Sequence, residues 1–149
     1  TIVSFAEETP VILRLGGITE NQIRLICPHV RVQIQHLPDS ADIPGQLLKH
    51  YAPTVTFIPF NEEISSIEHE NEAIGYLFFN KPDERILKNS KSKIKWLTEN
   101  SDMNVAASNL YSILRELDEQ NLNKVYFQWA PNEGLGKAVN DRLERAQSR

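Results

Sequence analysis

Hydrophobic and polar positions alternate in regular blocks from residue 54 to the end of the chain. Short apolar runs predict strands, and apolar residues spaced three or four apart between those runs predict helices. Strands that alternate with helices are joined by right-handed crossovers, so a mainly parallel sheet with helices on both faces is expected. The predicted fold class is α/β, with a Rossmann-like domain over residues 54–149. Strands are predicted at 55–60, 74–79, 94–97 and 125–130, and helices at 61–72, 103–117 and 135–146.

Residues 1–36 carry shorter elements. Thr19 and Gln22 form a capping-box pattern that opens a helix. These few elements bury too small a core to be stable alone. We therefore interpret this segment as the tail of a larger domain. Because a β-branched strand begins at Thr1, without an initiator methionine, we expect residues upstream. Strands are predicted at 2–5, 11–15 and 30–34, and the helix at 20–27.

Residues 37–53 are predicted to be a semi-rigid interdomain linker, because they contain three prolines and one glycine. His50 stands beside Tyr51, and both rings donate and accept hydrogen bonds. From the residues alone, two interpretations are equally good. The pair contacts a ligand, or it ties the linker to the two domains.

Composition and charge describe an ordinary globular chain. It has 149 residues, 40% of them hydrophobic, and a net charge of -4. The negative balance gives no basic footprint for nucleic acid, so no direct nucleic-acid binding is expected. No apolar run approaches the ~20 residues of a membrane span, no signal peptide is visible, and no membrane partner is expected. Cys27 is the single cysteine, which fits a reducing compartment, and a cytoplasmic location is expected.

Arg14 ends an apolar strand just before Gly16 and Gly17. A guanidinium group there could clamp a phosphate while the glycines let the ligand approach. On the residues alone, a surface arginine at a strand end is the favoured interpretation.

Two other patterns favour structural roles. The segment GLGK at 134–137 lacks Walker A spacing, so a tight strand-to-helix turn is favoured over an anion site on the helix N-terminus. His29, His36, His69 and Cys27 have no ligand-like spacing, so no metal site is expected.

Four blocks, in order along the chain, resemble the two-domain L-threonylcarbamoyladenylate synthases. The first is similar to the end of the family's Ser-Thr-(Val/Ile)-Val strand, and the second to its Ile-Leu-Arg-Pro-Gly-x-Ile-Thr block. The third is similar to the linker of that family, and the fourth to its C-terminal domain signature. The blocks are TIV at 1–3, ILRLGGIT at 12–19, PGQLLKHYAP at 44–53, and LYSILRELD at 110–118 with GLGKAVNDRLERA at 134–146.

The resemblance implies an enzyme that joins L-threonine, bicarbonate and ATP into threonylcarbamoyl-AMP and releases pyrophosphate. Its product feeds tRNA threonylcarbamoyladenosine modification, so the tRNA threonylcarbamoyl-transfer machinery is the implied downstream partner. ATP is implied as a substrate, with Mg²⁺ in the full-length enzyme, and no cofactor is expected to bind tightly to this chain. By resemblance Arg14 binds the ATP phosphates, His50 and Tyr51 close over the nucleotide, and Thr1 contacts substrate. No residue is assigned a catalytic role.

The chain also departs from the family pattern. Leu15 replaces the proline after the arginine, and the linker lacks the usual serine, methionine, basic residue and tyrosine, where Ile43, Gln46, Leu47 and Leu48 stand. Most of the YrdC-type catalytic domain is missing, so this chain alone is expected to be inactive. Residues 1–36 are then the end of that domain, 37–53 the linker and 54–149 the C-terminal domain. The alternatives are a non-catalytic regulatory or interaction module and a Rossmann-like domain that binds nucleotide by itself.

Overall fold

The computed structural model describes residues 1–34, 53–60, 73–89 and 92–147. Contacts within the chain divide these residues into two compact units. The first unit comprises the described residues of 1–52 together with 131–147, and the second comprises those of 53–130. Within the described residues, no helix is both long and apolar enough to cross a membrane.

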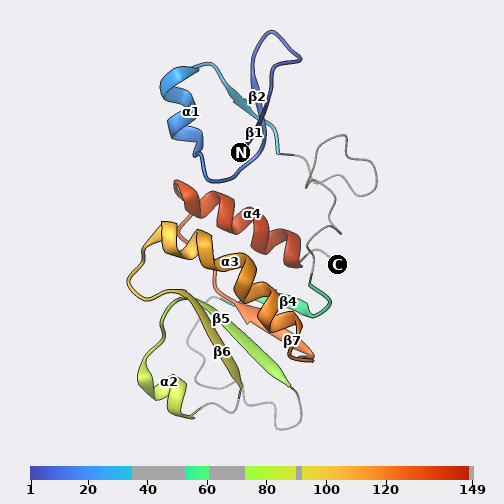
Figure 1. Cartoon of the computed structure of the whole chain (residues 1–149), viewed down its shortest axis with the longest axis vertical. Helices are drawn as coiled ribbons and strands as arrows, with labels where there is room; N and C mark the ends of the chain where they lie inside the picture. Colours follow the sequence, from blue (N-terminus) through green and yellow to red (C-terminus); the bar gives the residue numbers. More distant parts are fainter. Residues whose placement is uncertain (35–52, 61–72, 90–91, 148–149) are drawn as a thin grey trace. The chain divides into compact units, whose positions relative to one another are not determined.

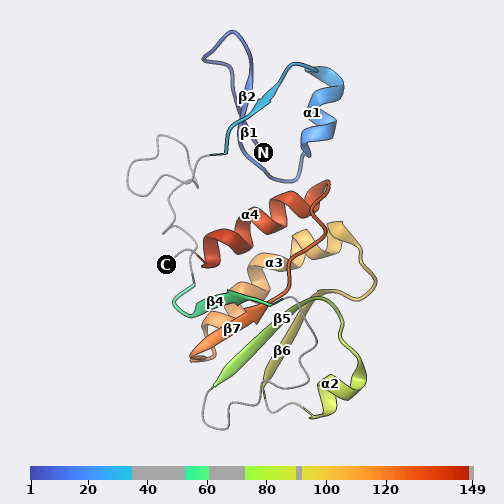
Figure 2. The ribbon, with the colours of Figure 1, turned by 180° about the vertical axis from the view of Figure 1, so that it is seen from behind.

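The second unit is built on a sheet of parallel strands, which confirms the predicted α/β class. The strand order is β4-β7-β5-β6, and each neighbouring pair is parallel (Figures 1 and 2). The central strand β5 is buried along nearly its whole length, as its continuous apolar run predicts. The strands are β4 (Thr56–Pro59), β5 (Ile74–Asn80), β6 (Lys93–Thr98) and β7 (Lys124–Phe127).

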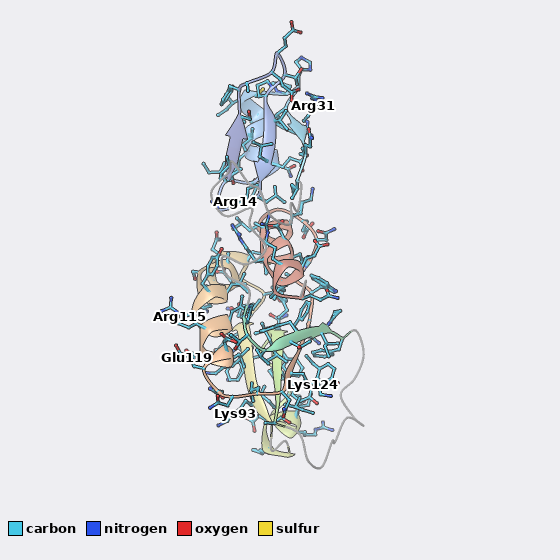
Figure 3. The ribbon with its side chains drawn as sticks, turned by 90° about the vertical axis from the view of Figure 1, so that its right-hand side faces the viewer. Arg14, Arg31, Lys93, Arg115, Glu119 and Lys124 are labelled. Carbon is cyan, nitrogen blue, oxygen red and sulfur yellow. The ribbon has the colours of Figure 1, made fainter. Side chains whose placement is uncertain are left out.

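One face of this sheet is covered by α3 (Met103–Asp118). The Asp102 carboxylate caps the helix by accepting hydrogen bonds from the backbone N–H groups of Asn104 at 2.8 Å and Val105 at 3.2 Å. Figure 3 shows Arg115 and Glu119, at the C-terminal end of the helix, pointing away from the sheet. The buried side chains of α3 recur at three- to four-residue spacing, as predicted: Ala106, Leu110, Leu114 and Leu117.

The other face of the sheet carries an aromatic cluster. Tyr76 stacks on Tyr126 with ring centroids 5.7 Å apart, and Phe60 meets Phe78 edge-on at 5.6 Å. These cross-strand contacts help to fix the register of neighbouring strands. Ile86 of α2 (Glu84–Asn89) packs against the same cluster. The sequence did not predict α2, because six residues show too little periodicity. The helix predicted at 61–72 lies outside the described residues.

The first unit joins a small three-stranded sheet to two helices. Strand β2 pairs antiparallel with β1 and parallel with β3. The predicted capping box opens α1, because Thr19 and Gln22 bond reciprocally. The predicted third strand at 30–34 is shorter than expected and covers only Arg31–Val32. Val30, just before it, is buried, while Val32 is 39% exposed. The elements are β1 (Ile2–Ser4), β2 (Val11–Arg14), α1 (Glu20–Ile26), β3 (Arg31–Val32) and α4 (Leu135–Gln147).

The helix α4 belongs by contact to this first unit, whereas its sequence position predicts it within 54–149. Ala138 packs against the core formed by Ile12, Leu15 and Val30. Apolar contact therefore brings the last helix to the strands at the start of the chain. The predicted linker boundaries at 37 and 53 stay a prediction, because 35–52 lie outside the described residues.

The carboxylate of Asp118 offers a test of how β4 is held at its start. It accepts hydrogen bonds from the hydroxyl of Thr54 at 2.6 Å and from the backbone N–H of Val55 at 3.0 Å. We expect Asp118→Ala to lower the free energy of unfolding by about 1–2 kcal/mol in urea denaturation, because these donors lose their acceptor. Asp118→Asn keeps an acceptor oxygen and should lose less. An unchanged midpoint for Asp118→Ala would contradict this role.

Candidate functional site

The pairing of β1 with β2 places Thr1 beside the end of β2. Ile2 lies opposite Arg14, and the register shifts between Ile2 and Val3. The Thr1 hydroxyl donates a hydrogen bond to the carbonyl oxygen of Ile18. The structure therefore brings together Thr1 and Arg14, two residues that the family resemblance assigns to the site.

At Gly16 the backbone after β2 comes very close to the backbone of Thr1. A Cβ atom at Gly16 would collide with the backbone nitrogen of Thr1 and would lie 3.2 Å from its Cα. At Gly17 a Cβ atom would meet nothing within 4 Å. The first glycine is thus needed for close approach of two chain segments, which is one ordinary reason for a glycine at a strand end.

The guanidinium group of Arg14 contributes positive charge at the same corner. Arg14 lies at the end of β2, opposite Ile2 of β1 (Figure 3 labels Arg14).

The side chain of Arg14 makes this corner suitable for binding an anion. Each guanidinium presents a planar fork of N–H donors that matches the oxygens of a phosphate or carboxylate. The same positive charge repels a divalent cation, so Arg14 suits an anion and does not suit Mg²⁺. Within the described parts of the chain, no group of three or more His, Cys, Asp or Glu side chains is placed to hold a metal ion.

The glycine-rich segment before α4 forms a turn. Gly134 has a φ of 48°, and the backbone N–H of Gly136 donates to the carbonyl of Glu133 at 2.8 Å. Lys137 Nζ lies 3.1 Å from Glu20 Oε2 in an ion pair. This geometry favours the turn interpretation, with the lysine joined to α1.

Glu20 also accepts a hydrogen bond from Arg24 Nε at 2.8 Å. The pKa of Glu20 is lowered by the hydrogen bonds from Arg24 and Lys137, with Arg24 contributing most. One partly buried carboxylate therefore joins the first turn of α1 to the first turn of α4. This contact fixes which part of α4 faces α1.

A buried ion pair lies further along α4. Arg145 Nε is 3.1 Å from Asp141 Oδ2, and the two side chains are 7% and 5% exposed. The periodicity of the sequence places apolar residues on this side of the helix and gives no sign that a charged pair is buried with them. Removing one partner would leave the other charge buried, so the pair is a constraint on the helix.

Comparison with known proteins identifies the family. A family model described as the C-terminal domain of threonylcarbamoyl-AMP synthase matches residues 18–148. The chain belongs to this family. Among curated relatives, threonylcarbamoyl-AMP synthase of Bacillus subtilis is 28% identical over 98% of this chain and 44% of its own length. The synthase of Schizosaccharomyces pombe is 25% identical over 99% of this chain and 41% of its own length. The chain thus spans less than half the length of these relatives.

Solved structures agree with the fold of this synthase-family chain. A Pyrococcus abyssi Sua5 complexed with L-threonine has a TM-score of 0.80 at 23% identity, over 99% of this chain and 45% of its own. A variant of that protein, with a histidine and the tyrosine after it replaced by alanine, has a TM-score of 0.74 at 20% identity. The second match covers 97% of this chain and 43% of the variant. These similarities support the α/β architecture.

The remaining predicted site residues of this family member, His50 and Tyr51, lie outside the described residues. Their predicted contact with a nucleotide stays a prediction. The described part of the candidate site therefore consists of the corner formed by Thr1, Arg14 and Gly16.

The adjacent glycines give a matched test of this corner. We expect Gly16→Ala to lower the free energy of unfolding by about 1–3 kcal/mol, because the added methyl forces β1 away from the strand end. Gly17→Ala adds a methyl group in open space and should change stability by less than about 0.5 kcal/mol. Thermal and urea denaturation of both variants measure this difference. Equal effects would show that Gly16 is not a point of close approach.

The Glu20 ion pairs predict a pH dependence of stability. Because the pKa of Glu20 is lowered in the folded state, its stabilisation is present above the ordinary value of 4.5 and is lost as pH falls through the folded value. We expect Glu20→Gln to cost about 0.5–1.5 kcal/mol at neutral pH. Denaturation at a series of pH values should show that the difference from the unmodified chain shrinks as pH falls below 4.5 and is lost below the folded pKa of Glu20.

The control is Glu84→Gln on α2. Glu84 also stands in the first turn of a helix and also pairs with a basic residue four positions later, but both side chains are largely exposed. Its replacement should leave stability nearly unchanged. If the two variants behave alike, the contact with Lys137 adds nothing.

Proposed function

We propose that this chain is the part of an L-threonylcarbamoyladenylate synthase that contains the end of the catalytic domain, the linker and the C-terminal Rossmann-like domain. The whole enzyme joins L-threonine, bicarbonate and ATP into threonylcarbamoyl-AMP and releases pyrophosphate, and is thus a nucleotidyltransferase. The family match over residues 18–148 carries the proposal. The curated relatives bear the same enzyme name, and one solved relative holds L-threonine.

The proposed site uses Arg14 for the phosphates of ATP and Thr1 for substrate. The antiparallel register supports this assignment, because it brings the two residues to one corner. A guanidinium at this strand end donates to phosphate oxygens in a partly buried environment, where charge-assisted hydrogen bonds are strong. Mg²⁺ would accompany ATP, and the residues at this corner would bind the nucleotide's phosphates.

The proposed lid is the linker with His50 and Tyr51. It would close over the nucleotide and exclude water from a carbamate intermediate that water hydrolyses. A consecutive histidine and tyrosine were replaced by alanine in one solved relative, and the only His-Tyr step of this chain is at 50–51. Ile43, Leu47 and Leu48 stand where the family has serine, a basic residue and tyrosine, so this linker lacks those polar groups and closure would depend on its second half.

The proposed product passes to the tRNA threonylcarbamoyl-transfer machinery in the cytoplasm. The chain's net charge of -4 supports a protein that hands on a small molecule and does not itself bind tRNA. Since the chain spans less than half of its relatives, we expect the 149 residues alone to be inactive.

The activity test uses the protein expressed from its complete reading frame. We expect pyrophosphate release that requires L-threonine, bicarbonate and ATP together, and a threonylcarbamoyl-AMP product detected by mass spectrometry. Arg14→Ala should lower kcat/KM for ATP by about 10–100-fold, because one charge-assisted interaction with the phosphates is lost. The circular dichroism spectrum should stay unchanged.

The control for this variant is Arg31→Ala. Arg31 is an exposed arginine of the same unit, paired with Glu7, and Figure 3 shows it well apart from Arg14. Its replacement should change kcat/KM by less than about twofold. A complete protein that makes no threonylcarbamoyl-AMP would refute the proposed activity and favour a non-catalytic module. An Arg14→Ala variant as active as the unmodified enzyme would refute the proposed phosphate site.

A further inference from the structure

We propose that the first turn of α4 positions the strand end that carries Arg14, with Lys137 and Ala138 as the two positioning residues. Neither residue is assigned a contact with substrate, and both act through the segment 12–20. The assignment of this segment to a nucleotide site rests on the proposed function. The contacts between α4 and the segment are features of the structure itself.

The apolar contact of Ala138 is made with the residues on either side of Arg14 in the sequence. Ala138 packs against the core of Ile12, Leu15 and Val30, which are 0%, 7% and 2% exposed. Ile12 lies two residues before Arg14, and Leu15 directly follows it. Withdrawal of the helix would open this core to water, so the strand end is better ordered while α4 is docked.

The ionic contact of Lys137 is made at the other end of the same segment. Lys137 Nζ lies 3.1 Å from Glu20 Oε2, and the Glu20 side chain is 18% exposed. Glu20 is the first residue of α1, and residues 15–19 connect it to Arg14 at the end of β2. Two consecutive residues of α4 therefore contact the segment before and after this connection.

The connection at 15–19 has little rigidity of its own. It contains Gly16 and Gly17, and glycine has the widest backbone freedom of any residue. A Cβ atom at Gly17 would meet no described atom within 4 Å, so that side of the residue faces open space. The position of Arg14 relative to α1 therefore depends on contacts outside the connection, and α4 supplies one at each end.

The second partner of Glu20 does not replace Lys137. Arg24 Nε lies 2.8 Å from Glu20 Oε1, but Arg24 is itself a residue of α1. This pair stabilises α1 internally and joins it to no other element. Lys137 is the partner that comes from a different element, so its loss frees the start of α1 from α4.

The proposed role gives the end of the chain an effect on nucleotide binding. The helix α4 follows β7, a strand of the second unit, but it belongs by contact to the first unit. Residues that come after the Rossmann-like sheet in the sequence would thus hold the strand end that binds phosphate. The affinity for ATP should then depend on the docking of α4.

The first test measures hydrogen–deuterium exchange and ATP kinetics in the protein from its complete reading frame. Lys137→Ala should raise the exchange rate of the backbone amides of 12–20 about two- to fivefold and leave those of β5 and β6 unchanged. The KM for ATP should rise by a similar factor with kcat nearly unchanged, because only binding is affected. Lys137→Arg keeps the positive charge and should restore both values.

The matched control is Lys95→Ala. Lys95 forms an ion pair with Glu116 that joins β6 to α3 in the second unit, and its side chain is 35% exposed against 39% for Lys137. Its replacement should leave the exchange of 12–20 and the KM for ATP unchanged. If Lys95→Ala changes them as much as Lys137→Ala does, a general loss of stability explains both and the inference is overturned.

The second test enlarges Ala138. Ala138→Leu should push α4 away from the core of Ile12 and Leu15, and both the exchange of 12–20 and the KM for ATP should rise by about tenfold. If this variant fails to fold, Lys137→Ala decides the question, because the replaced side chain is partly exposed. Unchanged exchange in the Lys137 variant overturns the inference, as does faster exchange with an unchanged KM for ATP.

These outcomes are separate from the test of the enzyme activity. A complete protein that makes no threonylcarbamoyl-AMP, yet exchanges faster at 12–20 only in the α4 variants, would refute the proposed function and keep the positioning of this segment by α4. A complete protein that makes the product, with α4 variants unchanged in exchange and in the KM for ATP, would do the reverse.

Discussion

The packing of α4 against the core beside β2 is the contact that supports the strand carrying Arg14. Lys137 and Glu20 are separated by 117 positions in the chain, yet they form an ion pair. Next to it, Ala138 enters the core under β2. The unit therefore combines residues from both ends of the chain, and the strand that carries Arg14 packs on the last helix.

The ion pair of Lys137 with Glu20 and the apolar packing of Ala138 contribute differently to the docking of α4. An ion pair with partly exposed partners contributes roughly 0–1 kcal/mol, so the pair of Lys137 with Glu20 does little to hold the helix. Apolar burial is worth about 25 cal/mol per Å² removed from water, and it supplies most of the attraction. A small alanine at position 138 lets the helix approach closely, but it does not by itself choose a rotation. The ion pair adds that choice, because only one rotation brings Lys137 to Glu20.

Local pattern predicted the strands, the capping box and α3, because each depends on residues close in sequence. The partner of α4 could not be predicted in the same way. Its amphipathic pattern shows that one side is buried, but the pattern is the same whichever element covers it. The short helix α2 has too few apolar positions to give a period.

The residues of the candidate site, like the elements of the fold, were only partly predictable from the sequence. Arg14 stood out because it ends an apolar strand before two glycines, and the family resemblance gave it a role. The buried pair of Asp141 with Arg145 lies on the apolar side of α4, where periodicity predicts only hydrophobic residues. A charged residue on a buried stripe is itself a signal, because burial of charge requires a partner or a ligand. Reading α4 for such exceptions would have identified both positions.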